Sequence, residues 1–356
     1  MIVKNLTLKN IRNHHYLSYE FQKGLNIILG PNGIGKTNIV EAIYYLSAVK
    51  SFRTPDELNL VQKGMEHGEI SSTIIQGDIT RKIKVLLSND GRRILMNNKP
   101  ITKLSDLAKS VNVVLFEPKD VLLFRGAPKE RRTFLDINIS KRSNVYLEHL
   151  SRYEKVLKER NELLKQENPD RTLLETTTEI LVKLSSLIVS YRQMYVKDIN
   201  DILIKITRAL TGVKNDIVVR YTPFVPFDKE FEQNANKAFL KALEGDLRRK
   251  ATSIGVHRED FSVSLNGRDI AMFGSQGENR LVALALKLSP YFLIEDKDKR
   301  PIVVLDDVLS ELDKTHQDRL IKFLRKLEQV FITATHADIK DASLYYLKPK
   351  TKKEVF

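Results

Sequence analysis

One stretch near the start of the chain constrains its fold more than any other: residues 24–49, which read GLNIILGPNGIGKTNIVEAIYYLSAV. A short β-forming run leads directly into a glycine-rich loop with the spacing G-x-x-x-x-G-K-[ST]. Apolar residues at helical spacing follow the loop, among them Ile39, Ile43 and Leu46. Strand, glycine loop and helix in this order form the context of a phosphate-binding loop. The sequence therefore predicts an α/β fold with a site for a nucleoside triphosphate.

The residues of this loop are expected to share the task of holding the triphosphate. Its glycines let backbone N–H groups surround a phosphate at the N-terminus of a helix. Lys36 is expected to neutralise the β and γ oxygens, and Thr37 to ligate Mg²⁺. The predicted contact residues are Gly30, Pro31, Asn32, Gly33, Ile34, Gly35, Lys36, Thr37 and Asn38.

A pair of acids completes the predicted metal site from a second strand. Residues 300–308 read RPIVVLDDV, a nearly continuous apolar run of the kind that is buried in a parallel sheet. Asp306 follows this run and is the expected Mg²⁺ partner, directly or through water. Asp307 is the better candidate for polarising the attacking water. Either aspartate alone could cap a helix, but both after a strand, in a chain with a phosphate loop, favour the metal interpretation.

Two further features extend the predicted site. Residues 273–288 read FGSQGENRLVALALKL, a glycine-containing turn followed by a helix with an apolar face. Its predicted anion contacts are Ser275, Gln276 and Gly277. Taken alone this is an ordinary helix start, but beside an existing phosphate loop it makes sense if it binds the nucleotide of another copy. His336 ends the strand predicted over 329–336, where a side chain can reach a γ-phosphate, although a lone histidine is more often structural.

The charge balance favours a polyanionic partner. Lys and Arg number 59 against 45 Asp and Glu, which gives a formal net charge of +14. Nucleic acid is the first candidate and an anionic membrane surface the second, while a generally basic, solvated surface is the alternative. The one dense basic cluster is KPKTKK at 348–353.

Cysteine content and hydropathy exclude several classes of protein. The chain has no cysteine, so a disulfide framework, a thiol nucleophile and a Cys-ligated metal are excluded. Its start lacks the layout of a signal peptide, and no apolar run approaches the ~20 residues that span a bilayer. A soluble, cytoplasmic protein without a membrane partner is therefore expected.

The pattern along the chain predicts a nucleotide domain that is split by an insertion. Residues 70–101 alternate with period two and are broken by Asn-Asp-Gly and Asn-Asn, which indicates a hairpin meander. Apolar stripes at 146–164 and 181–206, separated by a loop with Pro169, predict an antiparallel pair of helices. The expected domains are 1–117 (ATPase lobe, first half), 118–249 (inserted helical lobe) and 250–356 (ATPase lobe, second half).

The motifs follow the order found in ABC-type ATPase heads: phosphate loop, serine–glycine signature, Asp-Asp strand, the segment SELD and a strand-end histidine. Within that group the chain most resembles the RecF family, bacterial recombination mediators related to SMC proteins. Blocks that look like those of the family occur in family order over nearly the whole length, at 30–54, 115–136, 255–261, 273–280 and 305–313.

This resemblance implies an ABC/SMC-type P-loop ATPase head with a β-meander subdomain and an inserted, mostly helical second lobe. It also implies an ATP-dependent homodimer, in which Lys36 and Thr37 of one copy and Ser275 of the other hold each ATP. Slow, DNA-stimulated hydrolysis would release the pair from duplex DNA or from single-strand/double-strand junctions, with little sequence preference. RecR, RecO and RecA are the protein partners that the family implies, during repair of gapped DNA.

Two departures from the family pattern concern the nucleotide site. The family signature is usually Ser-Gln-Gly-Gln-Gln-Arg, and here Glu278 and Asn279 replace its two glutamines. Relatives also use a glutamine that senses Mg²⁺ and water in a loop after the first lobe. Glu117 lies near the corresponding place, and the sequence assigns that role to no residue.

Two other classes of P-loop protein stay open as alternatives. A transporter ATPase subunit would lack the charge of +14 and would normally carry Leu-Ser-Gly-Gly, whereas this chain has Ser-Gln-Gly-Glu. A GTPase switch would carry Asn-Lys-x-Asp, and NNKP at 97–100 lacks the aspartate.

Overall fold

The computed structural model describes residues 1–101, 107, 110–337 and 339–348, so most of the basic cluster at 348–353 lies outside the described residues. The chain forms two compact units. Unit 1 comprises Met1–Asp120, Ile206–Lys214 and Leu284–Phe356, and unit 2 comprises Val121–Lys205 and Asn215–Ala283. The units do not follow the boundary expected after residue 249, because residues 250–283 cluster with the helical segment. The expected division into two ATPase halves and an insertion stays a prediction.

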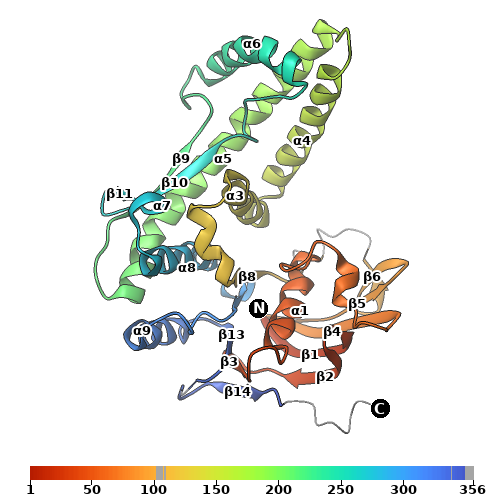
Figure 1. Cartoon of the computed structure of the whole chain (residues 1–356), viewed down its shortest axis with the longest axis vertical. Helices are drawn as coiled ribbons and strands as arrows, with labels where there is room; N and C mark the ends of the chain where they lie inside the picture. Colours follow the sequence, from red (N-terminus) through yellow and green to blue (C-terminus); the bar gives the residue numbers. More distant parts are fainter. Residues whose placement is uncertain (102–106, 108–109, 338, 349–356) are drawn as a thin grey trace. The chain divides into compact units, whose positions relative to one another are not determined.

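A parallel sheet of five strands forms the centre of unit 1 (Figure 1). Its order is β14-β3-β13-β12-β8, and every neighbouring pair is parallel. The strands are β3 (Gly24–Leu29), β8 (Val113–Phe116), β12 (Ile302–Leu305), β13 (Gln329–Ala334) and β14 (Ser343–Tyr346). All residues of β8, β12 and β13 are buried, as expected of strands that are covered on both faces.

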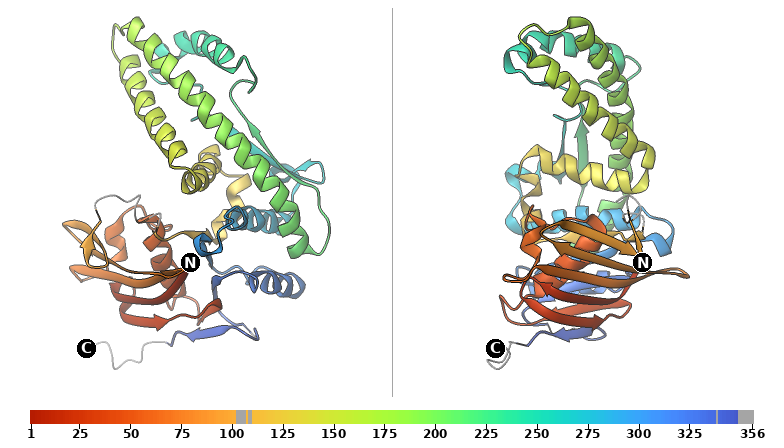
Figure 2. Two further views of the ribbon diagram at one scale, coloured as in Figure 1. Left: turned by 180° about the vertical axis from the view of Figure 1, so that it is seen from behind. Right: turned by 90° about the vertical axis from the view of Figure 1, so that its right-hand side faces the viewer.

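An antiparallel sheet of six strands forms the second layer of unit 1, and the right-hand view of Figure 2 shows its strands side by side. Its order is β2-β1-β4-β5-β6-β7. The strands are β1 (Ile2–Ile11), β2 (His14–Glu20), β4 (His67–Gln76), β5 (Ile79–Ser88), β6 (Gly91–Met96) and β7 (Lys99–Pro100). Asn97 and Asn98 turn the chain with φ values of 50° and 65°. The meander predicted for 70–101 is confirmed.

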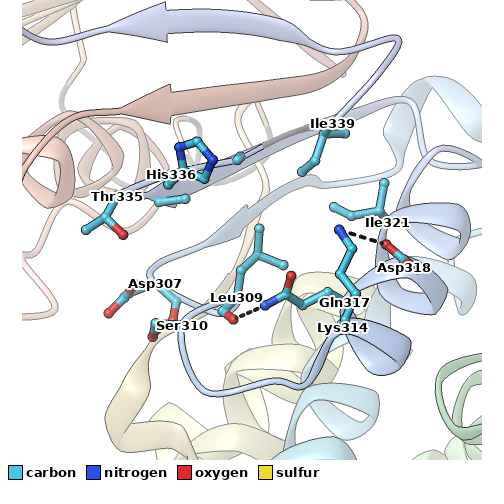
Figure 3. A pocket seen from close by; sticks show the side chains of 12 residues that line it. Asp307, Leu309, Ser310, Lys314, Gln317, Asp318, Ile321, Thr335, His336 and Ile339 are labelled. Atoms are coloured by element: carbon cyan, nitrogen blue, oxygen red, sulfur yellow. Dashed lines mark hydrogen bonds and ion pairs between the residues drawn. The ribbon is translucent and has the colours of Figure 1, made fainter.

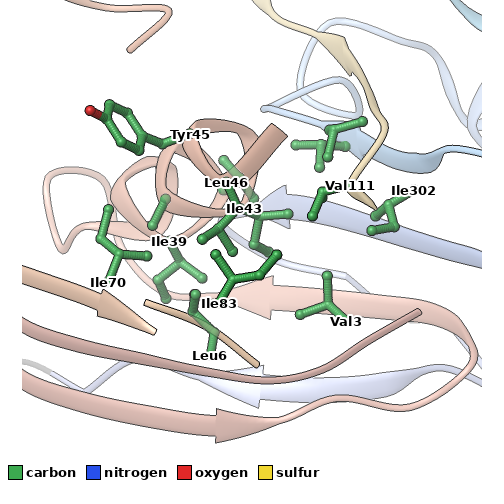
Figure 4. Packing of buried hydrophobic residues seen from close by; sticks show 14 of the residues in the cluster. Val3, Leu6, Ile39, Ile43, Tyr45, Leu46, Ile70, Ile83, Val111 and Ile302 are labelled. Carbon is green, nitrogen blue, oxygen red and sulfur yellow. The ribbon is translucent and has the colours of Figure 1, made fainter. Parts of the chain in front are cut away.

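Helix α1 (Lys36–Ala48) joins the two sheets through one apolar core (Figure 4). Its buried side chains, including Ile39 and Ile43, pack in one cluster with Leu6 and Ile83 of the antiparallel sheet and Ile302 of the parallel sheet. The position of the phosphate loop is therefore fixed by a core that involves both sheets. Helix α9 (Lys314–Leu324) and the short helices η1 (Glu57–Leu60), η2 (Pro118–Phe124) and η3 (Lys297–Lys299) complete the described helices that begin in unit 1.

Unit 2 is mostly helical and contains a small sheet. Its longest helices, α4 (Asn144–Leu164) and α5 (Arg171–Thr211), run antiparallel, since Arg160 of α4 donates to Thr178 of α5 and Arg192 of α5 donates to Tyr146 of α4. This confirms the predicted helical pair. The other elements are α3 (Pro128–Arg142), β9 (Ile217–Thr222), α6 (Phe231–Arg249), β10 (Asp260–Leu265), β11 (Arg268–Asp269), α7 (Ile270–Phe273) and α8 (Gln276–Phe292).

Arginine side chains tie residues 255–261 to the helices of unit 2. Arg192 is 1% exposed and donates to Glu259 at 3.1 Å and to Asp136 at 2.8 Å. Arg131 forms a two-pronged pair with Asp260, at 2.7 and 2.8 Å. Because β10 also pairs with β9, which follows α5, these contacts explain why residues 250–283 belong to unit 2. No helix among the described residues is long and apolar enough to cross a bilayer.

Candidate functional site

Four neighbouring strands of the parallel sheet end at the same edge, and each is followed by polar residues. The phosphate loop follows β3, His336 comes two residues after β13, Asp306 follows β12 and Glu117 follows β8. In the sheet these strands are adjacent in the order β3-β13-β12-β8. Polar groups from four distant parts of the sequence therefore meet at the carboxyl edge, where parallel α/β sheets bind ligands.

The phosphate loop is held from outside by the turn between β1 and β2. Asn13 Nδ2 donates to Ile34 O at 2.8 Å, and His14 Nε2 lies 3.2 Å from Gly35 O. Gly35 has φ 107°, and a Cβ there would lie 2.5 Å from Asn13 Oδ1. Both the backbone angle and the close approach therefore require glycine at this position.

Lys36 lies over its own loop. Its Nζ donates to Gly30 O at 2.7 Å and to Pro31 O at 3.0 Å, which places the ammonium group at the mouth of the loop. Burial lowers the pKa of Lys36, while Asp307 and Asp306 oppose that shift. A phosphate here would supply the nearby negative charge that favours a protonated lysine.

Thr37 and Asp306, which are far apart in the sequence, are in hydrogen-bond contact. Thr37 Oγ1 donates to Asp306 Oδ1 at 3.1 Å, and Thr333 Oγ1 donates to the same oxygen at 2.6 Å. Burial raises the pKa of Asp306, and the two hydroxyl groups oppose that shift. A cation beside this carboxylate would stabilise its charged form.

This oxygen pair fits Mg²⁺, which is usually held in phosphate sites by one or two protein oxygens together with water and substrate phosphates. Within the part of the chain that the structure describes, no cluster of three or more His, Cys, Asp or Glu side chains could form an all-protein metal cage. Thr37 and Asp306 are thus the residues that would hold the ion, and that role stays a prediction.

Asp307, which directly follows Asp306 in the chain, and His336 line one pocket (Figure 3). The pocket has a volume of about 210 Å³ and is also lined by Ser310 and Lys314. Asp307 has φ 49°, and its N–H donates to Thr333 Oγ1 at 2.9 Å. His336 is exposed at the rim. Two candidate catalytic side chains therefore line one cavity, and their catalytic roles stay predictions.

Glu117 is a residue of this edge to which the sequence assigned no role. Burial raises its pKa to about 7, and the ion pair with Lys119 at 2.9 Å opposes the shift. Its backbone N–H donates to Asp120 Oδ2 at 2.9 Å, and Lys287 pairs with Asp120 at 2.7 Å. A carboxyl group that titrates near neutral pH therefore lies at the end of the strand next to Asp306.

Asn38, the last residue of the predicted loop, has a structural task. Its Nδ2 donates to Asn13 Oδ1 at 2.7 Å, and its Oδ1 accepts from Arg53 at 2.6 Å. One turn later Glu41, which is fully buried, accepts two hydrogen bonds from Arg12, at 2.6 and 2.9 Å. Asn38 and Glu41 fasten the start of α1 to the turn between β1 and β2.

The signature residues Ser275, Gln276 and Gly277 begin α8 in unit 2 and are exposed. Ser275 Oγ accepts the N–H of Glu278 at 3.2 Å, and Glu278 accepts the N–H of Ser275 at 2.8 Å. This is a reciprocal capping box, in which glutamate replaces the usual family glutamine. Asn279 Nδ2 donates to the carbonyl groups of Gly274 and Ser275, both at 2.9 Å. Both departures from the family pattern therefore build the turn.

Comparison with known proteins assigns the chain to a family. The model described as RecF/RecN/SMC N terminal domain matches residues 2–348. The DNA replication and repair protein RecF of Oceanobacillus iheyensis is 34% identical over 97% of this chain and 98% of its own length. The chain belongs to the RecF family. The RecF protein of Bacillus subtilis is likewise 34% identical to this member, over 95% of this chain and 94% of its own length.

Solved structures agree with the RecF assignment. A structure of the recombination mediator protein RecF with ATP, described as part of the RecFOR pathway, superposes with a TM-score of 0.86 at 30% identity. The match covers 97% of this chain and 95% of that one. The Smc head domain of Pyrococcus furiosus gives a TM-score of 0.57 at 17% identity, over 94% of this chain and 89% of its own, and shows the fold alone. The expected ABC/SMC-type ATPase head fold is confirmed.

Sequence reasoning missed several residues of this RecF-family site. Thr333, which bridges the two aspartates, lies in an apolar strand, and nothing in that run marks it as functional. Arg12 and Asn13 precede the motif in a segment without a signature of its own, and Arg53 lies in the family-like block 30–54 but outside its phosphate loop. Asn38 in the loop was the one signal for Asn13 and Arg53. An amide side chain at that position needs hydrogen-bond partners, and these two residues supply them.

Proposed function

We propose that this protein is an ATP-dependent DNA-binding protein of recombinational repair. In this proposal ATP and Mg²⁺ bind at the carboxyl edge of the parallel sheet and pair two copies head to tail. The pair holds duplex DNA or a single-strand/double-strand junction, and slow, DNA-stimulated hydrolysis of ATP releases it. RecR, RecO and RecA would act with it, as the RecFOR pathway named for its structural relatives suggests.

The contact between Thr37 and Asp306 is the observation that carries the proposal. A hydroxyl group and a buried carboxylate lie 3.1 Å apart beside a lysine-bearing phosphate loop, and these groups would form the protein half of a Mg²⁺–triphosphate site. Lys36 would bind the β and γ oxygens. Asp307 and His336, on the adjoining pocket, are the candidates for polarising water and for contacting the γ-phosphate.

A second copy is part of the proposal because each chain has one phosphate loop and one signature turn. Ser275 precedes α8, a helix of 17 residues. The positive end of the helix dipole and the N–H groups of its first turn favour an anion at this N-terminus. The Ser275 hydroxyl accepts a hydrogen bond from Glu278 within its own helix, which leaves its proton for an outside acceptor. A γ-phosphate on another copy would be that acceptor.

The DNA part of the proposal is supported by charge and family. A net charge of +14 suits binding through phosphates, which is weakly sequence-specific and steeply salt-dependent. Fluorescence anisotropy with a gapped duplex should therefore show affinity that requires ATP and falls as salt is raised. Equal affinity with and without ATP, or a flat salt dependence, would contradict an ATP-controlled phosphate contact.

Sedimentation velocity with Mg²⁺ and ATP, with and without the gapped duplex, tests the core of the proposal. The wild-type chain should change from monomer to dimer when ATP is added. Lys36→Met should remain monomeric, because it lacks the charge that neutralises the buried phosphates. Asp307→Asn should form dimers that dissociate more slowly than those of the wild type. A wild-type chain whose sedimentation is unchanged by ATP would overturn the proposal.

A further inference from the structure

The short helix α7 ends in two exposed apolar side chains just before the signature turn. Met272 is 76% exposed and Phe273 is 68% exposed. Among the large apolar residues in the described part of the chain, Met272 is the most exposed, and Leu240 at 71%, Phe273 and Tyr16 at 64% follow it. Water contact with two adjacent large apolar groups is unfavourable, so a partner that covers them gains free energy from their burial.

The backbone that carries this pair is fixed by side chains on both sides. Asp269 Oδ1 accepts the N–H groups of Ala271 at 2.8 Å and of Met272 at 3.3 Å. Arg125 donates from Nε to Ala271 O and from one terminal nitrogen to Gly274 O, both at 3.0 Å. Ile270 at the start of the helix is buried. The two side chains are thus presented by an ordered turn, which lowers the entropy cost of binding through them.

The position of the pair in the chain identifies its occupant. Phe273 lies two residues before Ser275, and two residues span at most about 7 Å. In the proposed function, a second copy brings its nucleotide to Ser275. Any surface that delivers a phosphate to that hydroxyl must therefore also come close to Phe273.

The chemistry of the turn argues against a nucleic-acid phosphate as the occupant. The helix α7 carries no cationic side chain, and the guanidinium group of Arg125 beside it is engaged with two carbonyl oxygens of the turn. The exposed side chains of α7 itself, Met272 and Phe273, are apolar and need an apolar counterpart.

We propose that Met272 and Phe273 form an apolar contact surface for a second copy of this chain, held in position by Arg125. The surface lies beside the signature turn and adds apolar burial to the phosphate contact of Ser275. This inference rests on the proposed ATP-dependent pairing. Met272 and Phe273 would set the strength of pairing without touching the nucleotide.

The test compares the double variant Met272→Ser/Phe273→Ser with Leu240→Ser. The control also removes an exposed apolar side chain, but from α6 in the same unit. Sedimentation equilibrium with Mg²⁺ and ATPγS gives the dimer dissociation constant, and a fluorescent ATP analogue at low protein concentration gives nucleotide affinity of the monomer. The double variant should weaken pairing about tenfold or more, which corresponds to about 1.4 kcal/mol, with monomer affinity unchanged. Leu240→Ser should pair like the wild type.

Arg125→Ala provides a second variant that leaves the apolar pair in place. It should weaken pairing as well, and Arg125→Lys should not restore it, since one ammonium group cannot reproduce the two-pronged contact with Ala271 and Gly274. Thermal denaturation checks that these exposed changes leave the fold intact.

The outcomes distinguish a failure of the proposed contact surface from a failure of the proposed ATP-dependent pairing. If the wild type pairs with ATPγS and Ser275→Arg does not, but the double variant pairs as tightly as the wild type, the surface is overturned. It is also overturned if the double variant pairs normally and instead loses affinity for duplex DNA. If the wild type fails to pair, or Ser275→Arg still pairs, the proposed function itself fails, and this surface fails with it.

Discussion

The hydroxyl group of Thr333 lies 2.6 Å from Asp306 Oδ1 and donates to it, while the same hydroxyl oxygen accepts the N–H of Asp307 at 2.9 Å. One threonine of β13 therefore sets the positions of both candidate metal and catalytic acids at the end of β12. Because each acid is held through its neighbour strand, the geometry of the site depends on the pairing of two strands as much as on the motif itself.

Replacing Thr333 with valine keeps the shape of the side chain and removes this link. We expect Thr333→Val to lower the turnover number for ATP while changing nucleotide affinity little, because the phosphate loop is untouched. Loss of the hydrogen bond from the N–H of Asp307 should also lower the free energy of unfolding by about 1–3 kcal/mol. ATPase kinetics and urea denaturation measure the two effects. Thr80→Val, at an exposed position near the start of β5, is the control, and equal behaviour of the two variants would contradict the bridging role.

The pair formed by Arg12 and Glu41 should contribute more to stability than any exposed ion pair. Glu41 is fully buried in α1, and Arg12 meets both of its carboxylate oxygens. Arg12→Met leaves that carboxylate with Ser51 at 2.5 Å and Arg53 at 3.6 Å. We expect a loss of roughly 3–5 kcal/mol in the free energy of unfolding.

Urea denaturation of Arg12→Met can be compared with Lys9→Met. Lys9 pairs with Glu69 at 3.9 Å from a side chain that is half exposed, so its removal should cost at most about 1 kcal/mol. A loss for Arg12→Met no larger than that of Lys9→Met would show that the buried pair does not anchor α1.

The sequence could predict those parts of the site that a local pattern encodes. The loop before α1 and the acids after β12 follow from short-range spacing, and apolar runs indicated the buried strands. The strand order could not be read in the same way: β13 lies between β3 and β12, although it follows both in the sequence. Thr333 therefore reaches Asp306 through a pairing that no local pattern specifies.

Contacts that depend on two distant segments were missed for the same physical reason. Glu117 becomes part of the edge because β8 pairs with β12. Residues 250–283 join unit 2 because β10 pairs with β9, a strand inside a region that reads as helical. In both cases a short strand of four to six residues is defined by its partner more than by its own composition.

Gly255 should not tolerate a side chain. It has φ 119°, and a Cβ there would lie 2.5 Å from the hydroxyl group of Tyr153. Gly267→Ala is a matched control, because that glycine has φ 77° and nothing within 4 Å of its Cβ position. Both variants carry backbone strain. We expect Gly255→Ala to lose about 1–3 kcal/mol more free energy of unfolding than Gly267→Ala, as measured by urea denaturation, and this difference is the cost of displacing Tyr153. Equal losses would mean that the tyrosine moves aside freely.

His257 should make the stability of the protein depend on pH below neutrality. Its Nε2 donates to Thr252 O at 3.1 Å, and its Nδ1 lies 2.8 Å from the hydroxyl group of Tyr153, so the neutral ring satisfies both contacts. Burial lowers the pKa of His257 from 6.5 to about 4. Between these values the unfolded chain takes up a proton that the folded chain does not, so stability falls as pH falls from about 6.5 to about 4.

Replacement of His257 with glutamine isolates this contribution. The amide can donate to Thr252 and accept from Tyr153, but it does not titrate. Urea denaturation at pH 7 and pH 5 should show that the wild type loses about 1–2 kcal/mol more than His257→Gln on acidification. His15→Gln, at an exposed position, should follow the wild type at both pH values. If His257→Gln loses as much stability as the wild type between pH 7 and pH 5, the folded protein takes up the proton at that ring, and its pKa is not lowered by burial.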